Sequence, residues 1–299
     1  MYSEISATRT QKQLTPVRES ITAKPPYVSG TLELPASCFS FLYRITKDGH
    51  DARHINLADA TPDELEKLTR ACEPASFGRK QETVKDENYR KAVKMDSECF
   101  SPMLDVFHTD LVNIIYDCLL EGTQSTKRIK IELYKLNVYD KGSFFKPHVD
   151  TPRSKNIPTP HEGGALHFRH RSQEWIFDSG QVLAAKDKPS IGYASFFSDI
   201  EHEVAPVTSG HRVTLTYNLY FDDGPVSAVS MDLSPPLVNE RAFREAFTTL
   251  LEDQEFLAEG GTLAFGLRHV YPIKDDLKHV HSVLKGCDAL VYQSVRALG

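Results

Sequence analysis

Residues 129–150 read IKIELYKLNVYDKGSFFKPHVD, and this stretch decides what the rest of the chain can form. Its first half interleaves β-branched, aromatic and charged residues, which is typical of a β-strand with one buried face. Its end, His148-Val149-Asp150, carries two side-chain types that bind metals. Residues i and i+2 of a strand point to the same side, so His148 and Asp150 could bind one metal ion together.

Further strand candidates follow this stretch at short intervals. They are ALHF (165–168), EWIF (174–177), YASFF (193–197) and RVTLTYNLYF (212–221), separated by clusters of Gly, Pro, Asp and Ser. Many short strands at such spacing predict a barrel or a double-sheet jelly roll. The loop from Thr151 to Gly164 follows the His-x-Asp tripeptide directly, where a substrate-covering loop would belong.

Helices are expected on both sides of the strand series. Thr61-Pro62-Asp63-Glu64 has a capping residue, a proline suited to the first helical position and a glutamate that can close a capping box. Amphipathic helices are also predicted from Ser101-Pro102 to Gly122 and over residues 239–259. We therefore expect a mixed α/β (α+β) protein whose jelly-roll core is buttressed by N-terminal and C-terminal helices.

The composition and residue pattern of the sequence divide the chain into four segments. Residues 1–28 are polar, contain three prolines and lack a sustained period, which predicts a flexible arm. Residues 29–125 are expected to be a helical and strand support, and residues 126–222 to be the β-rich core. Residues 223–299 would be a C-terminal extension packed on that core. Because the last segment stays apolar to its final residue, we expect the chain to be a fragment of a longer protein.

Composition narrows the class of protein. The 299 residues are 40% hydrophobic and 25% charged, which is ordinary for a globular chain. A formal net charge of -6 gives no support to a nucleic-acid partner. No apolar leader and no run of about 18 apolar residues are present, so no membrane partner is expected. Five scattered cysteines without a Cys-x-x-Cys predict reduced thiols and an intracellular location, cytoplasmic or nuclear. The oligomeric state is not predicted.

Two residues extend the His-x-Asp tripeptide. His202 lies 52 residues after Asp150, and Arg212 lies ten residues further on. Two histidines and one carboxylate are the ligand set of the non-haem Fe(II) oxygenases. Taken alone, His202 is more simply a surface histidine, and Arg212 opens an Arg-Thr-Thr-Asn row that could face solvent. If that row faces a barrel interior instead, a buried arginine needs an anionic partner such as a dicarboxylate.

The joint spacing is more specific than its parts. It comprises Tyr139-x-x-Gly142-x-x-Phe145-x-Pro147-His148-x-Asp150, Gly163-Gly164, Gly192-x-x-x-Phe196 and His202-Glu203-Val204-x-Pro206-Val207-x-x-Gly210-x-Arg212. This pattern resembles the catalytic domain of 2-oxoglutarate- and Fe(II)-dependent dioxygenases, in particular the prolyl 4-hydroxylase-like branch. The resemblance covers about residues 126–222. It departs from the family at Ala165-Leu166, where an acidic or threonine-bearing strand usually begins.

The resemblance implies a fold, a reaction and the residues of a site. The fold would be a double-stranded β-helix (jelly roll). His148, Asp150 and His202 would bind Fe(II), and Arg212 would pair with the distal carboxylate of 2-oxoglutarate, with Thr214 as a hydroxyl partner. Tyr139 stands where the family often has a tyrosine that hydrogen-bonds this carboxylate, although an ordinary strand aromatic explains it equally well. The reaction would use O2, convert 2-oxoglutarate to succinate and hydroxylate a C–H bond.

Four functions stay open on sequence grounds. The substrate could be a prolyl or other side chain of a protein or peptide, or it could be a small molecule. The chain could also be a catalytically silent binding module of the same fold, or a zinc hydrolase that uses the same three ligands. All three ligands and Arg212 are present, which argues against the silent module. The position of Arg212 favours a co-substrate over hydrolysis.

Overall fold

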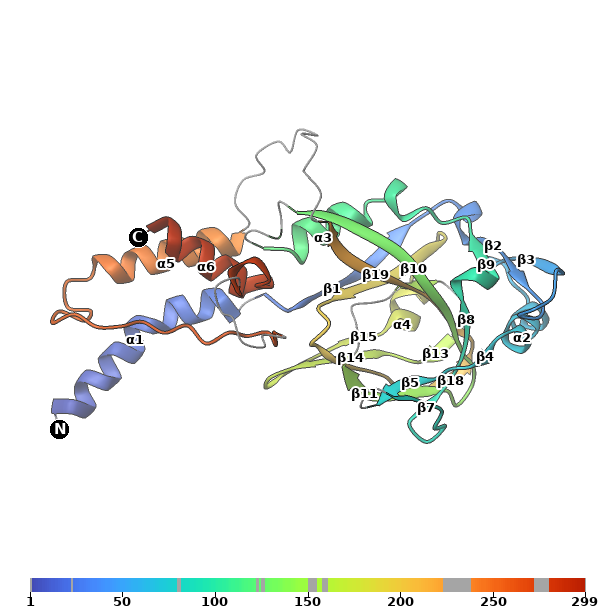
Figure 1. The fold of residues 1–299 in the computed structure, drawn as a ribbon, viewed down its shortest axis with the longest axis horizontal. Coiled ribbons are helices and arrows are strands. Elements are labelled where there is room, and N and C mark those ends of the chain that lie inside the picture. Colours follow the sequence, from blue (N-terminus) through green and yellow to red (C-terminus); the bar gives the residue numbers. More distant parts are fainter. Residues whose placement is uncertain are drawn as a thin grey trace. The chain divides into compact units, whose positions relative to one another are not determined.

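Two large antiparallel β-sheets are the main feature of the computed structural model (Figure 1). The structure describes residues 2–22, 24–79, 82–121, 124, 127–149, 155–157, 161–222, 238–271 and 280–298. The larger sheet contains seven strands in the order β1-β16-β12-β19-β10-β8-β4. Their bounds are β1 Tyr27–Glu33, β4 Glu73–Pro74, β8 Val93–Asp96, β10 Arg128–Tyr139, β12 Lys155–Ile157, β16 Ser190–Phe196 and β19 Arg212–Asp222.

The second sheet contains five strands in the order β15-β14-β17-β11-β7. Their bounds are β7 Arg90–Lys91, β11 Phe144–Val149, β14 Leu166–His170, β15 Gln173–Phe177 and β17 Glu201–Val204. From β10 to β19 the chain alternates between the two sheets. Strands β10, β12, β16 and β19 belong to the larger sheet, and strands β11, β14 and β17, which lie between them in the sequence, belong to the smaller sheet. This alternation defines a double-stranded β-helix, so the predicted fold class is confirmed.

Strand β19 shows why the sheets hold together and still leave a polar interior. Its residues Val213, Leu215 and Tyr217 are buried in one hydrophobic cluster with Leu136 and Val138 of β10. Its alternate residues Arg212, Thr214 and Thr216 are buried too, on the other face of the sheet. The Arg-Thr-Thr row therefore faces the interior between the sheets and not the solvent.

Smaller elements complete the part of the chain that contains the sheets. A three-stranded sheet has the order β3-β2-β9, and two further sheets contain two strands each, β13 with β18 and β5 with β6. The bounds are β2 Ser40–Arg44, β3 Ala52–Asn56, β5 Phe77–Arg79, β6 Glu82–Val84, β9 Phe100–Pro102, β13 His161–Gly163 and β18 Val207–Gly210. Helices are α2 Pro62–Ala71, α4 Ser179–Ala184 and the 3-10 turns η1 Ala36–Phe39, η2 Ser97–Cys99 and η3 Val106–His108. Leu65 and Leu68 of α2 pack into the same cluster as β10 and β19, so this N-terminal helix does buttress the core.

The chain divides into two compact units. The sheet unit comprises residues 27–112 and 129–220, and the helical unit comprises residues 1–26, 113–128 and 221–299. The sheet unit therefore combines most of the expected N-terminal support, residues 29–125, with most of the expected core, residues 126–222. The packing of residues 223–299 on that core stays a prediction. In the described residues, no helix combines the length and apolarity that crossing a membrane requires, and all five cysteines are free thiols.

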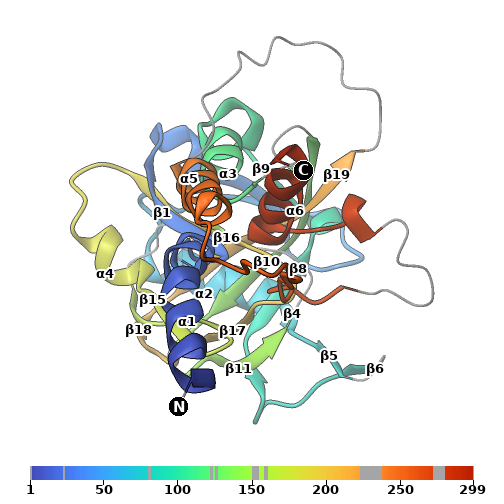
Figure 2. The same ribbon diagram turned by 90° about the vertical axis from the view of Figure 1, so that its left-hand side faces the viewer.

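The helical unit differs from the expectation of a flexible arm. Residues Tyr2–Thr22 form helix α1, which contacts α5 (Val238–Glu252), and α5 contacts α6 (Gly286–Leu298) (Figures 1 and 2). Val17 of α1 is buried with Phe243 and Phe247, and Leu14 and Ile21 pack against the same cluster. The spacing of residues 14, 17 and 21 is a helical stripe too short to identify among polar residues, and its partners lie more than 200 positions away in the sequence.

The predicted helix from Ser101-Pro102 begins later than expected. Residues Phe100–Pro102 are strand β9, and helix α3 covers only Leu111–Cys118. The side chain of Asp105 accepts a hydrogen bond from the backbone of Phe107, and the Thr109 hydroxyl donates to the carbonyl of Val106. These local bonds stabilise a 3-10 turn at residues 106–108 in place of the first helical turn. The last 3-10 turn of the chain, η5, covers Val280–Ser282.

The N-terminal cap of α2 contains the predicted capping box, and its contribution to the free energy of unfolding can be measured. The backbone N–H of Glu64 donates to the Thr61 hydroxyl, and the Glu64 carboxylate accepts from the Thr61 backbone, which completes a capping box. Thr61→Ala should lower the free energy of unfolding by about 1 kcal/mol. Urea denaturation measures it. Thr61→Ser, which keeps the hydroxyl, is the control and should stay near wild type; equal losses in both variants would contradict a capping role.

Candidate metal and co-substrate site

His148 and His202 lie directly opposite each other on neighbouring strands. The antiparallel register of β11 and β17 pairs His148 with His202, with a β-bulge between Phe145 and His148. The two imidazole ring centroids are 4.2 Å apart, and the ring planes are inclined by 55°. Two histidines that are 54 positions apart in the sequence are therefore adjacent in the folded chain.

Local hydrogen bonds set the orientation of both imidazoles. The Nδ1 atom of His148 is 2.7 Å from the carbonyl oxygen of Lys146, and the Nδ1 atom of His202 is 3.1 Å from the carbonyl oxygen of Ile200. A carbonyl oxygen only accepts, so Nδ1 donates its proton in each ring and Nε2 keeps its lone pair. Metal-binding histidines are commonly held in this way. The pair is thus prepared to offer two nitrogen donors.

Asp150, the third predicted ligand, lies outside the described residues, and its role stays a prediction. The last described residue before it is Val149, which ends strand β11.

Arg212 is a buried cation without an anionic partner among the described residues. The side chain is 2% exposed, and its Nε atom has no hydrogen-bond acceptor. Burial lowers the pKa of Arg212 to about 10, although Tyr139 and Asp178 act in the opposite direction. The guanidinium therefore remains charged at neutral pH, and within the described residues no ion pair compensates for its burial. A carboxylate of a ligand would provide this compensation.

Tyr139 and Thr214 line the same pocket as Arg212, and their predicted roles toward a bound carboxylate stay predictions. The guanidinium carbon of Arg212 is 5.3 Å from the centroid of the Tyr139 ring, a cation–π distance. The Thr214 hydroxyl oxygen accepts from the Nδ2 atom of Asn137 at 3.4 Å. Because that bond uses the oxygen as an acceptor, the hydroxyl proton can be donated to a ligand.

One pocket contains all the described residues of the predicted site. It encloses about 450 Å³ of space, part of which is open to solvent. Its lining comprises Arg90, Lys135, Asn137, Tyr139, Phe145, His148, Leu166, Phe196, His202, Val204, Arg212, Thr214 and Thr216. These residues come from both large sheets, and none of the described lining residues is acidic. The pocket combines two histidines, buried cations and apolar walls, which suits a small anionic ligand next to a metal ion.

Several lining residues had no predicted role in the site. Lys135 and Asn137 share a face of β10 with Tyr139, so a period of two counted back from Tyr139 would have found them. Phe145 was recognised only as part of the family pattern. Arg90 has no sequence signal, because its strand is two residues long and its partners are distant in the chain.

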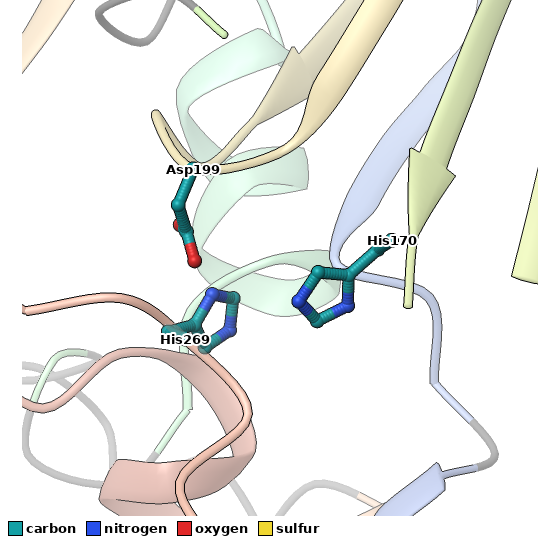
Figure 3. Close-up of side chains that lie close together, drawn as sticks. All are labelled: His170, Asp199 and His269. Atoms are coloured by element: carbon teal, nitrogen blue, oxygen red, sulfur yellow. The ribbon is translucent and has the colours of Figure 1, made fainter. Parts of the chain in front are cut away.

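A second pair of ligand-type side chains occurs elsewhere in the sheet unit. His170 ends β14, and Asp199 precedes β17; their ligand atoms lie within 4.8 Å of each other (Figure 3). Figure 3 also draws His269, which belongs to the helical unit. Neither His170 nor Asp199 lines the pocket that contains His148 and His202.

The chain is similar to several solved structures at low sequence identity. No family model matches the sequence, and no curated protein does. Similar solved structures include a Pseudomonas putida prolyl-4-hydroxylase, with 17% identity over 69% of this chain and 97% of that chain and a TM-score of 0.38. A 2OG-Fe(II) oxygenase family protein from Burkholderia pseudomallei has 16% identity over 69% and 90%, with a TM-score of 0.31.

A third similar structure is a Trichoplax adhaerens prolyl hydroxylase in complex with a hypoxia inducible factor peptide fragment. It has 14% identity over 72% of this chain and 91% of that chain, with a TM-score of 0.39. At these identities and TM-scores the comparisons do not assign an activity, so the function has to be argued from the residues of the site.

Gly164 offers a test of the placement of Arg212. Gly164 has a φ of +69°, and a Cβ atom there would lie 2.8 Å from Cδ of Arg212 and 2.9 Å from Cγ2 of Val207. Gly164→Ala should displace the arginine and weaken binding of a dicarboxylate such as 2-oxoglutarate about tenfold or more. Isothermal titration calorimetry measures the affinity.

Gly142→Ala is the matched control, because Gly142 has a φ of +82° and a Cβ there would approach only the flexible Lys91 amine, at 3.4 Å. It reproduces the backbone strain without the contact to Arg212. Equal loss of dicarboxylate affinity in both variants would show that strain, and not the arginine, is responsible.

Proposed function

We propose that this chain is an Fe(II)- and 2-oxoglutarate-dependent dioxygenase. The observation that carries the proposal is one pocket of a double-stranded β-helix that holds His148 opposite His202 and also holds the buried, uncompensated Arg212. The overall reaction would convert a C–H bond, O2 and 2-oxoglutarate to an alcohol, succinate and CO2.

The donor set suits the metal. His148 and His202 each offer Nε2, and Asp150 would complete two histidines and one carboxylate, the set that leaves open positions on Fe(II). When bound, the metal would supply the activation of O2 that is coupled to the decarboxylation of 2-oxoglutarate. The protein contributes the fixed imidazoles, because their Nδ1 hydrogen bonds to the carbonyls of residues 146 and 200 prevent rotation of the rings.

The co-substrate would be recognised by the larger sheet. Arg212 would pair with the distal carboxylate of 2-oxoglutarate, and the hydroxyl of Thr214 would donate to the same group. The Tyr139 ring beside the guanidinium fixes its position and shields it from water. Burial makes the pairing of Arg212 with a carboxylate stronger than it would be at the surface. Leu166, Phe196 and Val204 provide apolar walls that limit the water in the pocket.

For the substrate we propose a side chain of a protein or peptide, with proline as the leading candidate. The support is the exposure of the site near the metal-binding residues: His148 is half-buried, and Val149 beside it is 59% exposed. A large substrate can approach such a surface. Hydroxylation of a small molecule is the alternative, and screening peptides and metabolites by succinate release separates the two.

Anaerobic titration with Fe(II) and 2-oxoglutarate tests the proposed metal and co-substrate. The wild-type protein should develop the visible metal-to-ligand charge-transfer absorption of a chelated 2-oxo acid. His148→Ala, Asp150→Ala and His202→Ala should abolish it because each removes a ligand. Arg212→Met should retain Fe(II) binding but raise the 2-oxoglutarate concentration at half-saturation by roughly 100-fold, as expected for a charged hydrogen bond of about 3 kcal/mol.

The outcomes also separate the alternative functions. Arg212→Lys keeps the charge without the planar fork and should lie between wild type and Arg212→Met. Absence of the absorption band in intact protein would contradict the oxygenase proposal. Zinc-dependent hydrolysis without any effect of 2-oxoglutarate would favour the hydrolase, and binding without turnover on any substrate would favour the silent module.

A further inference from the structure

Arg90 is a buried arginine that contacts both large sheets. It belongs to β7, at the edge of the smaller sheet, and only 5% of the residue is exposed. One terminal nitrogen of its guanidinium donates to Oδ1 of Asn137 in the larger sheet at 2.8 Å. The guanidinium carbon lies 4.4 Å from the ring centroid of Phe145 in the smaller sheet. The other terminal nitrogen donates to the carbonyl of Ser76 at 2.8 Å.

Phe145 connects Arg90 to the first histidine of the site. The Phe145 and His148 rings stack with centroids 3.5 Å apart and an interplanar angle of 22°. The bulge between these two residues brings both side chains to the interior, although they are three positions apart. The His148 ring thus packs against Phe145, and the Phe145 ring packs against the guanidinium that covers it.

Asn137 connects Arg90 to the co-substrate side of the pocket. Because Oδ1 of Asn137 accepts from Arg90, Nδ2 of the same amide points to Thr216 and Thr214, at 3.0 and 3.4 Å. The arginine therefore fixes which way the amide faces. Because Nδ2 of Asn137 donates to the Thr214 hydroxyl oxygen, that oxygen acts as an acceptor, and the hydroxyl proton is available for a ligand.

The partners of Arg90 are neutral, which makes a purely stabilising role a poor explanation. Within the described residues, no carboxylate forms an ion pair with Arg90, and its Nε atom has no acceptor. The carbonyl, the amide and the ring around Arg90 compensate for the desolvation of its guanidinium only in part. An apolar side chain of similar size would fill the same space without that cost. A guanidinium differs from an apolar side chain because its rigid, planar set of donors can fix two hydrogen-bond acceptors in different directions at once.

We propose that Arg90 is a positioning residue, which fixes His148 for metal binding through Phe145 and orients Asn137 and Thr214 for the co-substrate. The inference rests on the proposed function for its metal and 2-oxoglutarate. The contact chain Arg90–Phe145–His148 is testable without either of them.

The first experiment uses metal-free protein with isotope-labelled histidine. The Cε1–H signal of His148, assigned by its loss in His148→Gln, should be shifted upfield by the stacked Phe145 ring. Arg90→Met, which keeps a flexible unbranched stem and removes the guanidinium, should move this signal downfield. Phe145→Leu should move it further, and the double variant should match Phe145→Leu alone, since residues acting through one contact are not additive. The signal of exposed His108 is the internal reference.

The second experiment measures Co(II) affinity by absorption titration. Arg90→Met should bind Co(II) roughly 10- to 100-fold more weakly, the range for partners that orient a metal ligand. Arg90→Lys should recover part of the loss, because its ammonium can still donate a hydrogen bond but lacks the planar fork that reaches Ser76 and Asn137 together. Arg169→Met is the matched control: Arg169 is also a multiply bonded arginine of the smaller sheet, but it pairs with Glu174 and Glu203 and does not line the pocket.

The outcomes distinguish the inference from the proposed function. An unmoved His148 signal and unchanged Co(II) affinity in Arg90→Met, with only a lower melting temperature, would overturn the positioning role and leave a structural one. A wild-type protein that binds no metal would overturn the proposed function. In that case a His148 shift in Arg90→Met would still support the contact chain. Arg169→Met should match wild type in both measurements, and a loss equal to that of Arg90→Met would also overturn the inference.

Discussion

The antiparallel pairing of β11 with β17 is the interaction on which the site depends. It places His148 opposite His202 and, through the exchange of strands between the sheets, brings β10 and β19 to the facing wall of the same pocket. Backbone hydrogen bonds define this register, and a slip of one residue in either strand would turn the histidine of that strand to the opposite face of the sheet. The hydrophobic cluster around Leu136, Val213 and Leu215 makes such a slip unfavourable on the larger sheet.

The two arginines that line the pocket form no ion pair with a carboxylate of the described residues. Arg212 and Arg90 are both buried, and each has an Nε atom without an acceptor among the described residues. Arg90 is held by neutral groups of both sheets, whereas the guanidinium of Arg212 lies near the Tyr139 ring and its Nε atom has no acceptor among the described residues. The different surroundings suggest different roles, with one guanidinium used to hold the walls and the other left to bind a carboxylate.

Much of the core could be predicted because its signals are local. The alternation within residues 129–139 and 212–220, the capping box at Thr61 and the spacing from Tyr139 to Arg212 are all visible in the sequence. The flexible arm expected at residues 1–28 was not found, because α1 is stabilised by Phe243 and Phe247 and not by its own composition. The helix expected from Ser101 starts at Leu111, because Asp105 and Thr109 bond to the nearby backbone. Asp150 stays a prediction.

The sequence by itself predicted the ligand types and their order and determined the jelly-roll class, since strand period and residue spacing are properties of the chain alone. It left open whether the Arg212-Thr214-Thr216 row faces solvent or the interior, because period two defines two faces and does not say which one is covered. The tertiary structure decided this by burying both faces of β19. It also revealed Arg90, whose contacts with Asn137 and Phe145 arise only when strands 47 or more positions apart in the chain come together.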